Sequence, residues 1–488
     1  MLHRELGQLP RPQRAGGHRG GRRLNEAPAQ PHLRRVLALR DLAVVAAAAI
    51  GPAFSLATTM APMIAAAGRW TPLAVVLIAV LMAMIASGYK RLGERQRDAG
   101  SSYAWIRSAF GPEAGAYGAW ILIVANVFAT LATALPAGTY TLDLVAPALA
   151  ANPLAVALVG CGWVIATSLL LWYGLKPTTT LTLLLLAAEL GVLGVAAAVA
   201  AAHPRPGAVA FAGGGVPWSG LVAATVVGIW MIDGWEVSAS TAEEAQGDAG
   251  APGAGGLLGL ALTSAILIAG IVAFERIGSA AGFAGHDRDA LAYVGGLLGG
   301  GWEQVLTLTV LLSFAASLQT TLVYLTRSLY SMGRDGVLPA PLGRLDRREE
   351  PTAAIVVIAI LSLAFCLAAG VSPTAKNAFD LVLAGTSWFL GVLFVLTAAA
   401  AVRVFADTES KRWSGAILPG TSAVILIGIL AAALWGDDPP TRGFIAASAI
   451  IGLPLALWRG RAARRASRAG GGQQSGVAFE RQRNRFDP

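Results

Sequence analysis

Two short stretches place groups that could bind a small zwitterion inside an otherwise apolar sequence. The first is AAAAIGPAFSLA (Ala46–Ala57), in which Gly51 and Pro52 stand side by side. Proline lacks the N–H of the helical ladder and glycine adds backbone freedom, so a helix is interrupted there. The second is WMIDGWE (Trp230–Glu236), where Asp233-Gly234 breaks another apolar run. Both interruptions free backbone groups for binding.

The freed groups at the first break have complementary charges. Backbone released from a helix cannot face lipid, because each unpaired N–H or C=O costs several kcal/mol there, so it must line a cavity. The N–H groups from Ala53 to Ser55 open a second half-helix and suit a carboxylate. The carbonyl groups from Ala48 to Ile50 suit an ammonium or another cation. A zwitterion fits both, and the alternative is a Gly-Pro kink used only for packing.

Glu189 is the one charged residue within its apolar run, between LLLLAA and LGVLG. A charge at membrane depth is expensive and marks a functional hypothesis. Burial favours the neutral form of a carboxyl group, so Glu189 could take up and release a proton near neutral pH. The alternative is a structural glutamate that is hydrogen-bonded to a backbone or hydroxyl partner.

The elements that must position these residues are membrane-spanning helices. The chain has 488 residues, of which 55% are hydrophobic and 13% charged, with a mean hydropathy of +0.61. About 20 apolar residues cross a bilayer. This criterion predicts an all-α polytopic membrane protein with about 12 spans, of which the third and eighth are long enough to tilt or extend beyond the bilayer. The predicted spans are 42–67, 71–89, 115–146, 153–173, 179–202, 219–242, 256–275, 303–331, 353–371, 377–402, 417–435 and 441–458.

The basic residues predict the orientation. They gather in Lys90–Arg97, Arg327–Arg348, Arg403–Arg412 and the two tails, which places both termini on the cytoplasmic side of the cell membrane. We interpret the net charge of +9 as this signal plus attraction to anionic lipid, not as nucleic-acid binding. Residues 1–40 read as a disordered basic tail without a signal peptide, and 461–488 as a second cytoplasmic tail.

The two breaks fall in the first and sixth spans, which correspond if the first ten spans form two units of five. Five is odd, so the second unit enters the membrane from the opposite side. The sequence therefore predicts an inverted repeat, with repeat one over 42–202 and repeat two over 219–402, within a transporter domain at 41–460. Spans eleven and twelve, over 417–458, are appended. Broken helices at matching positions of such repeats indicate the central site of a transporter.

Other classes of membrane protein lack support in the sequence. Cys161 and Cys366 lie singly in spans, which argues against a disulfide framework or a metal cluster. All five histidines fall in tails or outer loops, so an embedded metalloenzyme is disfavoured, and we expect no cofactor. A channel would need a charged ring or a repeated filter, and a sensor would need a signalling domain larger than these tails.

Four motifs follow one another over roughly residues 40–360. They are IGPAFS at the first break, DAGSSYAWIRSAFGPEAGAYGAW (Asp98–Trp120), DGWEVSASTAEEA (Asp233–Ala245) and SLQTTLVYLTRSLYSMGRDGVLP (Ser317–Pro339). Together they resemble the amino acid–polyamine–organocation (APC) permeases, and most of all an actinobacterial-type amino acid permease branch. The loop after Glu243-Glu244 departs from the family, because it reads QGDAGAPGAGG and lacks the usual basic residues, so a salt bridge that relatives make from that loop does not carry over to this chain.

The resemblance implies roles for several residues. Asn126 lies on a helix beside the substrate, where it could hydrogen-bond to the side chain of the substrate or only make a hydrogen bond between two helices. Trp230 corresponds to an aromatic gate, and Glu236 to a glutamate that holds the unwound backbone, while Asp233 is less typical and is expected to face an aqueous vestibule. Some relatives carry a basic residue on the helix that contains Glu189, facing a cation site next to the first break, and here an acid would have to serve instead. The candidate substrate ligands are Ile50, Gly51, Ala53, Phe54, Ser55, Asn126, Trp230, Met231, Asp233 and Gly234.

The eighth span offers a second coupling site and an anchor. Hydroxyls of Ser317, Thr320 and Thr321 could join the first-break carbonyls in a sodium site, although such hydroxyls often bond their own helix. Arg334 and Asp335, like Arg327, would close this helix at the cytoplasmic face. We predict a proton-coupled permease for an amino acid or amine. An exchanger or a sodium symporter is the alternative, and a sensor or channel is the alternative from another class.

Overall fold

The computed structural model describes residues 33–287, 289–371, 375–436 and 438–470. Most of the two predicted tails therefore lies outside the described residues. Regular structure in the described ranges is helical, apart from one isolated bridge between Leu37 and Ala245. The α-helices are α1 (Leu39–Ile50), α2 (Pro52–Ala67), α3 (Thr71–Arg95), α4 (Ser102–Phe110), α5 (Pro112–Val145), α6 (Pro153–Tyr173), α7 (Leu175–Ala202), α8 (Trp218–Ile232), α9 (Val237–Ser240), α10 (Ala251–Phe274), α11 (Ala280–Ala284), α12 (Ala290–Leu298), α13 (Trp302–Arg334), α14 (Thr352–Gly370), α15 (Ala375–Phe405), α16 (Leu418–Gly436) and α17 (Pro439–Gly470).

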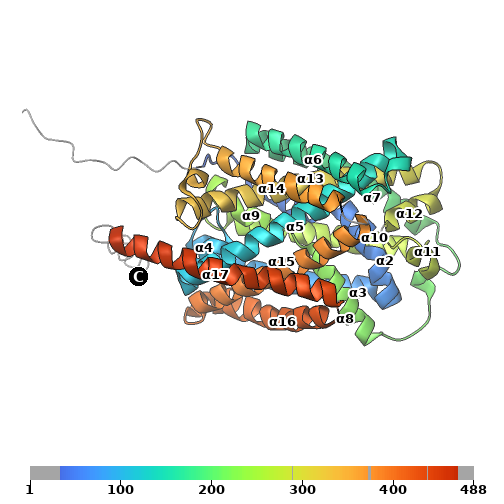
Figure 1. Ribbon diagram of the computed structural model, residues 1–488. Coiled ribbons are helices and arrows are strands. Elements are labelled where there is room, and N and C mark those ends of the chain that lie inside the picture. Colours follow the sequence, from blue (N-terminus) through green and yellow to red (C-terminus); the bar gives the residue numbers. More distant parts are fainter. Residues whose placement is uncertain (1–32, 288, 372–374, 437, 471–488) are drawn as a thin grey trace, which may run out of the picture.

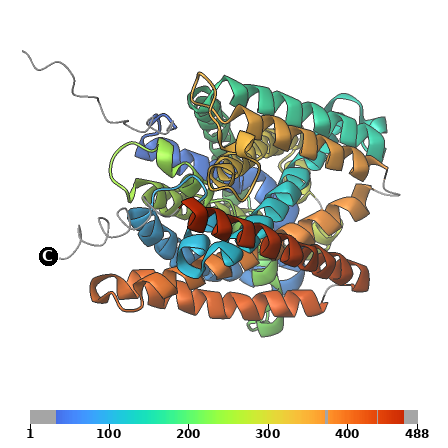
Figure 2. The same cartoon turned by 60° about the vertical axis from the view of Figure 1, so that its left-hand side comes forward.

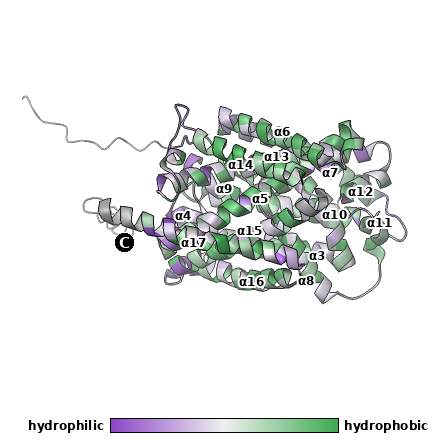
Figure 3. Cartoon of the chain, viewed as in Figure 1, coloured by the Kyte–Doolittle hydropathy of each residue, from purple (hydrophilic) through white to green (hydrophobic). Residues whose placement is uncertain are grey.

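The predicted spans are present. Within the described residues, 11 helical segments are long and apolar enough to cross a membrane. The first of them, Leu39–Arg95, contains both halves of the broken first span and the returning α3, so the fold matches the prediction of about 12 spans. Figure 3 shows apolar residues along the helices and hydrophilic residues gathered at the ends of the bundle. The long third and eighth spans are α5, with 34 residues, and α13, with 33.

Both predicted breaks are confirmed. The first span divides into α1 and α2 at Gly51, whose φ of 60° and ψ of 78° lie in the left-handed region that glycine adopts readily. Pro52 then opens α2, at a position where its missing N–H costs little. In the sixth span, α8 ends at Ile232 and α9 begins at Val237, with Gly234 at a φ of 105° between them.

The two long helices lie at the centre of the bundle. Helix α5 packs against α6, α13, α15 and α17, and α13 also packs against α1 and α7. The apolar stretch of α5 is 83% buried and that of α13 is 78% buried. By contrast, α16 runs along the outside of the bundle in both ribbon views, with α17 also exposed (Figures 1 and 2). The central helices are therefore the ones that can line an internal site.

We call the end of the bundle that holds α4, α9 and the C-terminal end of α17 the tail side, and the opposite end, with α11 and α12, the loop side (Figure 1). An ion cluster closes the tail side. The guanidinium of Arg327, which is fully buried, donates to Glu244 at 3.0 and 3.1 Å and to Glu350 at 2.7 Å. This cluster joins α13 to the short helix η4 (Ala242–Glu244) and to the start of α14.

A second set of ion pairs on the tail side joins three of the motifs quoted above. Arg334 donates to Glu243 at 2.8 and 3.0 Å and to Asp98 at 3.3 Å. Asp335 accepts hydrogen bonds from Tyr103 and Arg107. The acidic pair Glu243-Glu244 therefore forms its salt bridges with arginines of α13, while the loop after the pair contains no basic residue. Burial raises the pKa of Asp98, although Arg334 opposes this shift.

Candidate functional site

The two breaks meet near the middle of the bundle. Gly234 lies so close to the first break that a Cβ atom added there would be 2.8 Å from the carbonyl carbon of Ala49. The hydroxyl of Ser317 on α13 donates to the carbonyl of Ala49 at 2.9 Å. The carbonyl of Ile50 accepts from the hydroxyl of Ser55 at 2.8 Å. The carbonyl of Ala49, released at the first break, therefore faces the sixth and eighth spans.

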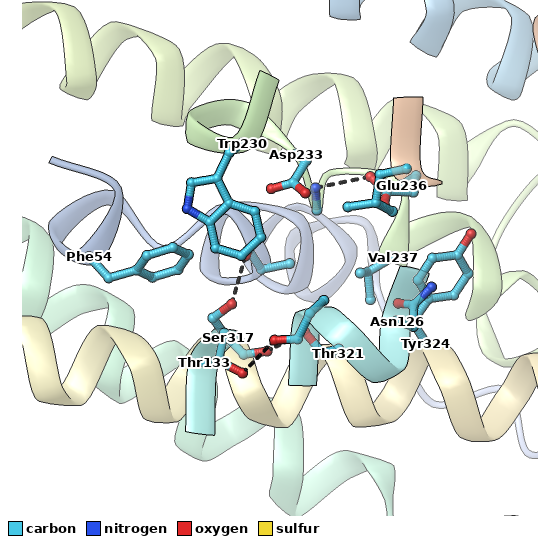
Figure 4. Close-up of a pocket in the computed structure, with 14 residues that line it drawn as sticks. Phe54, Asn126, Thr133, Trp230, Asp233, Glu236, Val237, Ser317, Thr321 and Tyr324 are labelled. Carbon is cyan, nitrogen blue, oxygen red and sulfur yellow. Dashed lines mark hydrogen bonds between the residues drawn. The ribbon is translucent and has the colours of Figure 1, made fainter. Parts of the chain in front are cut away.

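A small cavity lies at this junction (Figure 4). Its volume is about 30 Å³, which is room for water but not for an amino acid, so the site is closed around its lining. Side chains from α2, α5, α8 and α13 surround it. The lining residues are Ala49, Phe54, Asn126, Ala129, Thr133, Trp230, Asp233, Gly234, Glu236, Val237, Ser317, Thr321, Tyr324 and Leu390.

Many candidate residues from the sequence reach this cavity. The cavity is lined by Phe54, Asn126, Trp230, Asp233, Gly234, Glu236, Ser317 and Thr321. Other candidates are packed close by without lining it, namely Ile50, Gly51, Ala53, Ser55, Met231, Glu189 and Thr320. Arg334 and Asp335 lie on the tail side, in the ion pairs described above.

Sequence reasoning missed several lining residues, among them Thr133 and Tyr324. Helical spacing could have found both. Thr133 lies seven residues after Asn126 on α5, and Tyr324 lies seven after Ser317 on α13, which places each pair on one helical face. Leu390 belongs to α15 and carries no comparable signal, because nothing local indicates that α15 approaches the breaks.

Aromatic side chains cover the cavity on its loop side. The ring of Phe54 stacks on Phe314 at 4.8 Å and lies 6.0 Å from Trp230, and Tyr140 lies 5.6 Å from Phe314, all between ring centroids. The direction of α13 shows that these rings lie on the loop side of the cavity. Helix α13 begins on the loop side, and Phe314 precedes the cavity-lining Ser317 in it. The indole nitrogen of Trp230 has no hydrogen-bond partner among the described residues.

The polar lining carries acids and no cation. Asp233 and Glu236 are 7% and 2% exposed, and Glu236 accepts a hydrogen bond from the N–H of Gly234 at 3.0 Å. Glu236 thus contacts the unwound backbone, and the structural role that the resemblance implies for it stays a prediction. Asn126 donates to the carbonyl of Leu122 on its own helix at 2.9 Å. No Lys or Arg lines the cavity within the described part of the chain, so an ammonium group finds partners more readily than a carboxylate.

Glu189 reaches the first break directly. One carboxyl oxygen accepts from the backbone N–H of Ala53 and from the hydroxyl of Ser313, both at 2.6 Å. The other oxygen is buried and has no partner among the described residues. Two opposing effects act on the ionised form of Glu189. The N-terminus of α2 stabilises its negative charge, and burial destabilises it. A change in the protonation of this carboxyl group would therefore change its hydrogen bond to the start of α2, in the broken span.

The N–H groups that open α2 already have partners. Ala53 donates to Glu189, Phe54 donates to Ser313 at 3.3 Å, and Ser55 donates to the carbonyl of Gly51 at 2.9 Å. A substrate carboxylate at this helix end would have to displace at least one of these bonds. Binding of a zwitterion at the first break therefore remains a prediction, and the Glu189 carboxylate would compete there with the carboxylate of the substrate.

The eighth-span hydroxyls divide into two kinds. Ser317 donates across to Ala49, as a site shared with the first break requires. Thr320 and Thr321 instead donate to carbonyls of their own helix, at 2.9 Å to Ser317 in each case. Such bonds are common for threonine in apolar helices and do not by themselves indicate a cation site.

Comparison with known proteins gives one match and one negative result. A family model described as amino acid permease matches residues 41–455, which is most of the chain. Comparison with curated proteins gives no significant match. The match covers both breaks, the cavity and all four motifs. The chain therefore belongs to the amino acid permease family of the APC superfamily, and it is a transporter of amino acids.

Proposed function

We propose that this permease imports an amino acid or a related amine by alternating access, with Glu189 as the proton carrier. The observation that carries the coupling is the contact of the Glu189 carboxyl group with the N–H of Ala53, at the start of the second half of the broken span. A protonatable group at that position acts on the same helix end that a substrate carboxylate would use.

Orientation follows from the basic residues. The clusters at Lys90–Arg97 and Arg327–Arg348 lie toward the tail side, where the positive-inside rule places the cytoplasm. In this assignment both termini are cytoplasmic, and the aromatic residues over the cavity face the outside. The proposed five-plus-five repeat is supported separately, because its two broken helices meet at the cavity.

Alternating access requires that each side of the cavity can be closed. On the loop side, Phe54, Trp230 and Phe314 cover the cavity. On the tail side, the ion cluster of Arg327 joins α13 to the segment after the second break. Opening either set would expose the cavity to one side only. In this scheme the small cavity belongs to a state in which both sets are closed.

Coupling follows from competition between two carboxylates for one helix end. An ionised Glu189 occupies the N–H of Ala53 and repels a second anion nearby. A neutral Glu189 holds that N–H less strongly and permits a substrate carboxylate to approach. By linkage, protonation and substrate binding then favour each other. Proton and substrate would move in the same direction.

The test is uptake into proteoliposomes, screened first across the twenty amino acids with and without an inward proton gradient. Glu189→Gln mimics the permanently protonated form. It should keep substrate exchange at zero gradient and lose gradient-driven accumulation. Ser313→Ala is the matched control, because it removes a second donor to the same carboxyl oxygen yet leaves a titratable group. It should keep accumulation.

Full accumulation by the Gln variant would rule out Glu189 as the carrier. Loss of exchange as well as accumulation would instead indicate a structural role. The alternatives have distinct signatures in the same assay. An exchanger needs substrate on the far side of the membrane. A sodium symporter responds to a sodium gradient, and the Ser317 hydroxyl with the carbonyl of Ala49 could help to bind the ion.

A further inference from the structure

A second cavity lies on the loop side, away from the two breaks. Its volume is about 230 Å³, which is enough for several water molecules or a small polar head group. It lies between the turn after α2, the short helix η3 (Val209–Phe211) and the end of α10. The lining residues are Arg69, Trp70, Pro72, Ala210, Val272, Glu275 and Arg276.

The acid of this cavity is buried and unsatisfied. Glu275 is only 2% exposed, and one of its carboxyl oxygens has no hydrogen-bond partner among the described residues. No ion pair to Glu275 occurs in that part of the chain. Burial raises the pKa of Glu275 to about 8, although a hydrogen bond from Thr71 opposes this shift. A buried carboxyl group without a partner requires an explanation, and a bound cation would supply one.

The cations of the cavity are only partly used. Arg276 follows Glu275 directly, and its Nε atom is buried without a partner among the described residues. Its guanidinium lies 5.9 Å from the ring centroid of Phe211. Arg69 lies 5.2 Å over the ring of Trp70 and donates to the carbonyl of Gly214 at 2.9 Å. Both guanidinium groups keep further N–H donors for an anion.

We propose that this cavity binds a zwitterion that carries a primary ammonium and an anionic oxygen group. The ammonium would pair with Glu275, and the anionic group would accept hydrogen bonds from Arg69 and Arg276. Two sources share this chemistry, a free amino acid and the head group of phosphatidylethanolamine. The inference does not depend on Glu189 or on the direction of transport.

The position of this cavity connects it to the helix α2 that the transport proposal involves. Arg69 and Trp70 directly follow α2, the second half of the broken first span. Glu275 and Arg276 directly follow α10, which packs against both α1 and α2. A ligand held between these two turns would fix the loop-side end of α2 relative to α10. Occupancy would therefore modulate any step in which α2 moves.

The test uses full-length protein labelled with 5-fluorotryptophan and observed by ¹⁹F NMR. Trp70 lines the cavity, and its signal among those of 13 tryptophans is assigned by loss in Trp70→Phe. Glycine is titrated as the free-zwitterion probe. In a separate arm, nanodiscs of phosphatidylcholine are compared with nanodiscs that also contain phosphatidylethanolamine. Phosphatidylcholine is the matched lipid control, because its quaternary ammonium cannot donate a hydrogen bond to Glu275.

We expect the Trp70 signal to shift with glycine or with phosphatidylethanolamine, and the responding arm identifies the source. Glu275→Gln and Arg276→Gln should each weaken the response at least tenfold. Asp287→Asn, an exposed loop-side acid outside the cavity, should leave it within twofold. The apparent affinity should rise between pH 6 and 9 as Glu275 ionises. The other charged groups in the lining of the cavity are Arg69 and Arg276.

Three results would overturn the inference. The first is no shift of the Trp70 signal in either arm. The second is a Trp70 shift that phosphatidylcholine produces as strongly as phosphatidylethanolamine while glycine produces none, which would show that the ammonium is not recognised. The third is an unchanged response in Glu275→Gln, provided that this variant gives the same dispersed ¹⁹F spectrum as the parent protein. Each result is independent of transport activity, so failure of the coupling proposal would not affect the outcome.

Discussion

Arg327→Met should strongly destabilise the bundle on its tail side. Met has a similar length and no charge, so the change removes the guanidinium while keeping much of the volume. Arg327 is fully buried and donates to two carboxylates, Glu244 at 3.0 and 3.1 Å and Glu350 at 2.7 Å. Without it, two acids that are 2% and 7% exposed face each other with no cation between them.

The expected magnitude follows from the partners that remain. Glu350 keeps a hydrogen bond from the N–H of Leu175 at 3.0 Å, whereas Glu244 loses both of its bonds from Arg327. Removing one partner of a buried ion pair typically costs about 3–5 kcal/mol, because an uncompensated charge stays buried. We expect a loss in this range. Burial already raises the pKa of Glu244 and Arg327 opposes this, so the variant should be less destabilised at low pH, where Glu244 is protonated.

The assay is reversible unfolding in mixed detergent micelles, which reports the free energy of unfolding. Arg412→Met is the control, because Arg412 is an exposed tail-side arginine and its loss should change stability by about 0.5 kcal/mol or less. Adding Glu244→Gln and Glu350→Gln to Arg327→Met should recover much of the loss, since the unpaired charges are gone. A cost of under about 1 kcal/mol for Arg327→Met, or a triple variant no more stable than the single one, would contradict the stabilising role of this ion cluster.

Two further predictions concern the first break and the loop-side acid. Gly51→Leu should fold but bind substrate at least tenfold more weakly, because a Cβ atom there meets the ring of Phe54 and the φ of 60° disfavours side chains. Binding of labelled substrate measures this loss, and Gly191→Leu, at an open helical position, is the control. Normal affinity of the Gly51→Leu variant would contradict the prediction. The thermal midpoint should fall as pH rises from about 4.5 to about 8, because folding raises the pKa of Glu275 and so favours its protonated form. Glu275→Gln should flatten this slope, and an unchanged slope would assign it to other groups.

The sequence alone determined the elements and the positions of their interruptions. Span number follows from runs of apolar residues, because a bilayer requires about 20 of them whatever their neighbours. The breaks at Gly51 and Gly234 follow from local backbone chemistry, since proline and glycine interrupt a helix without help from tertiary contacts. Four motifs in order then sufficed to indicate the family, which the match over residues 41–455 establishes.

Only the tertiary structure decided which groups meet. Glu189 stands out in the sequence as a buried charge, but its contact with Ala53 depends on how α7 packs beside a helix that is 136 residues away in the chain. The same holds for Arg327 and its two acids, and for Glu275 and Arg69, which line one cavity. A side chain points to one face of its helix, and hydropathy does not reveal which neighbour covers that face when nearly every face is apolar. Packing of the whole bundle sets those pairs.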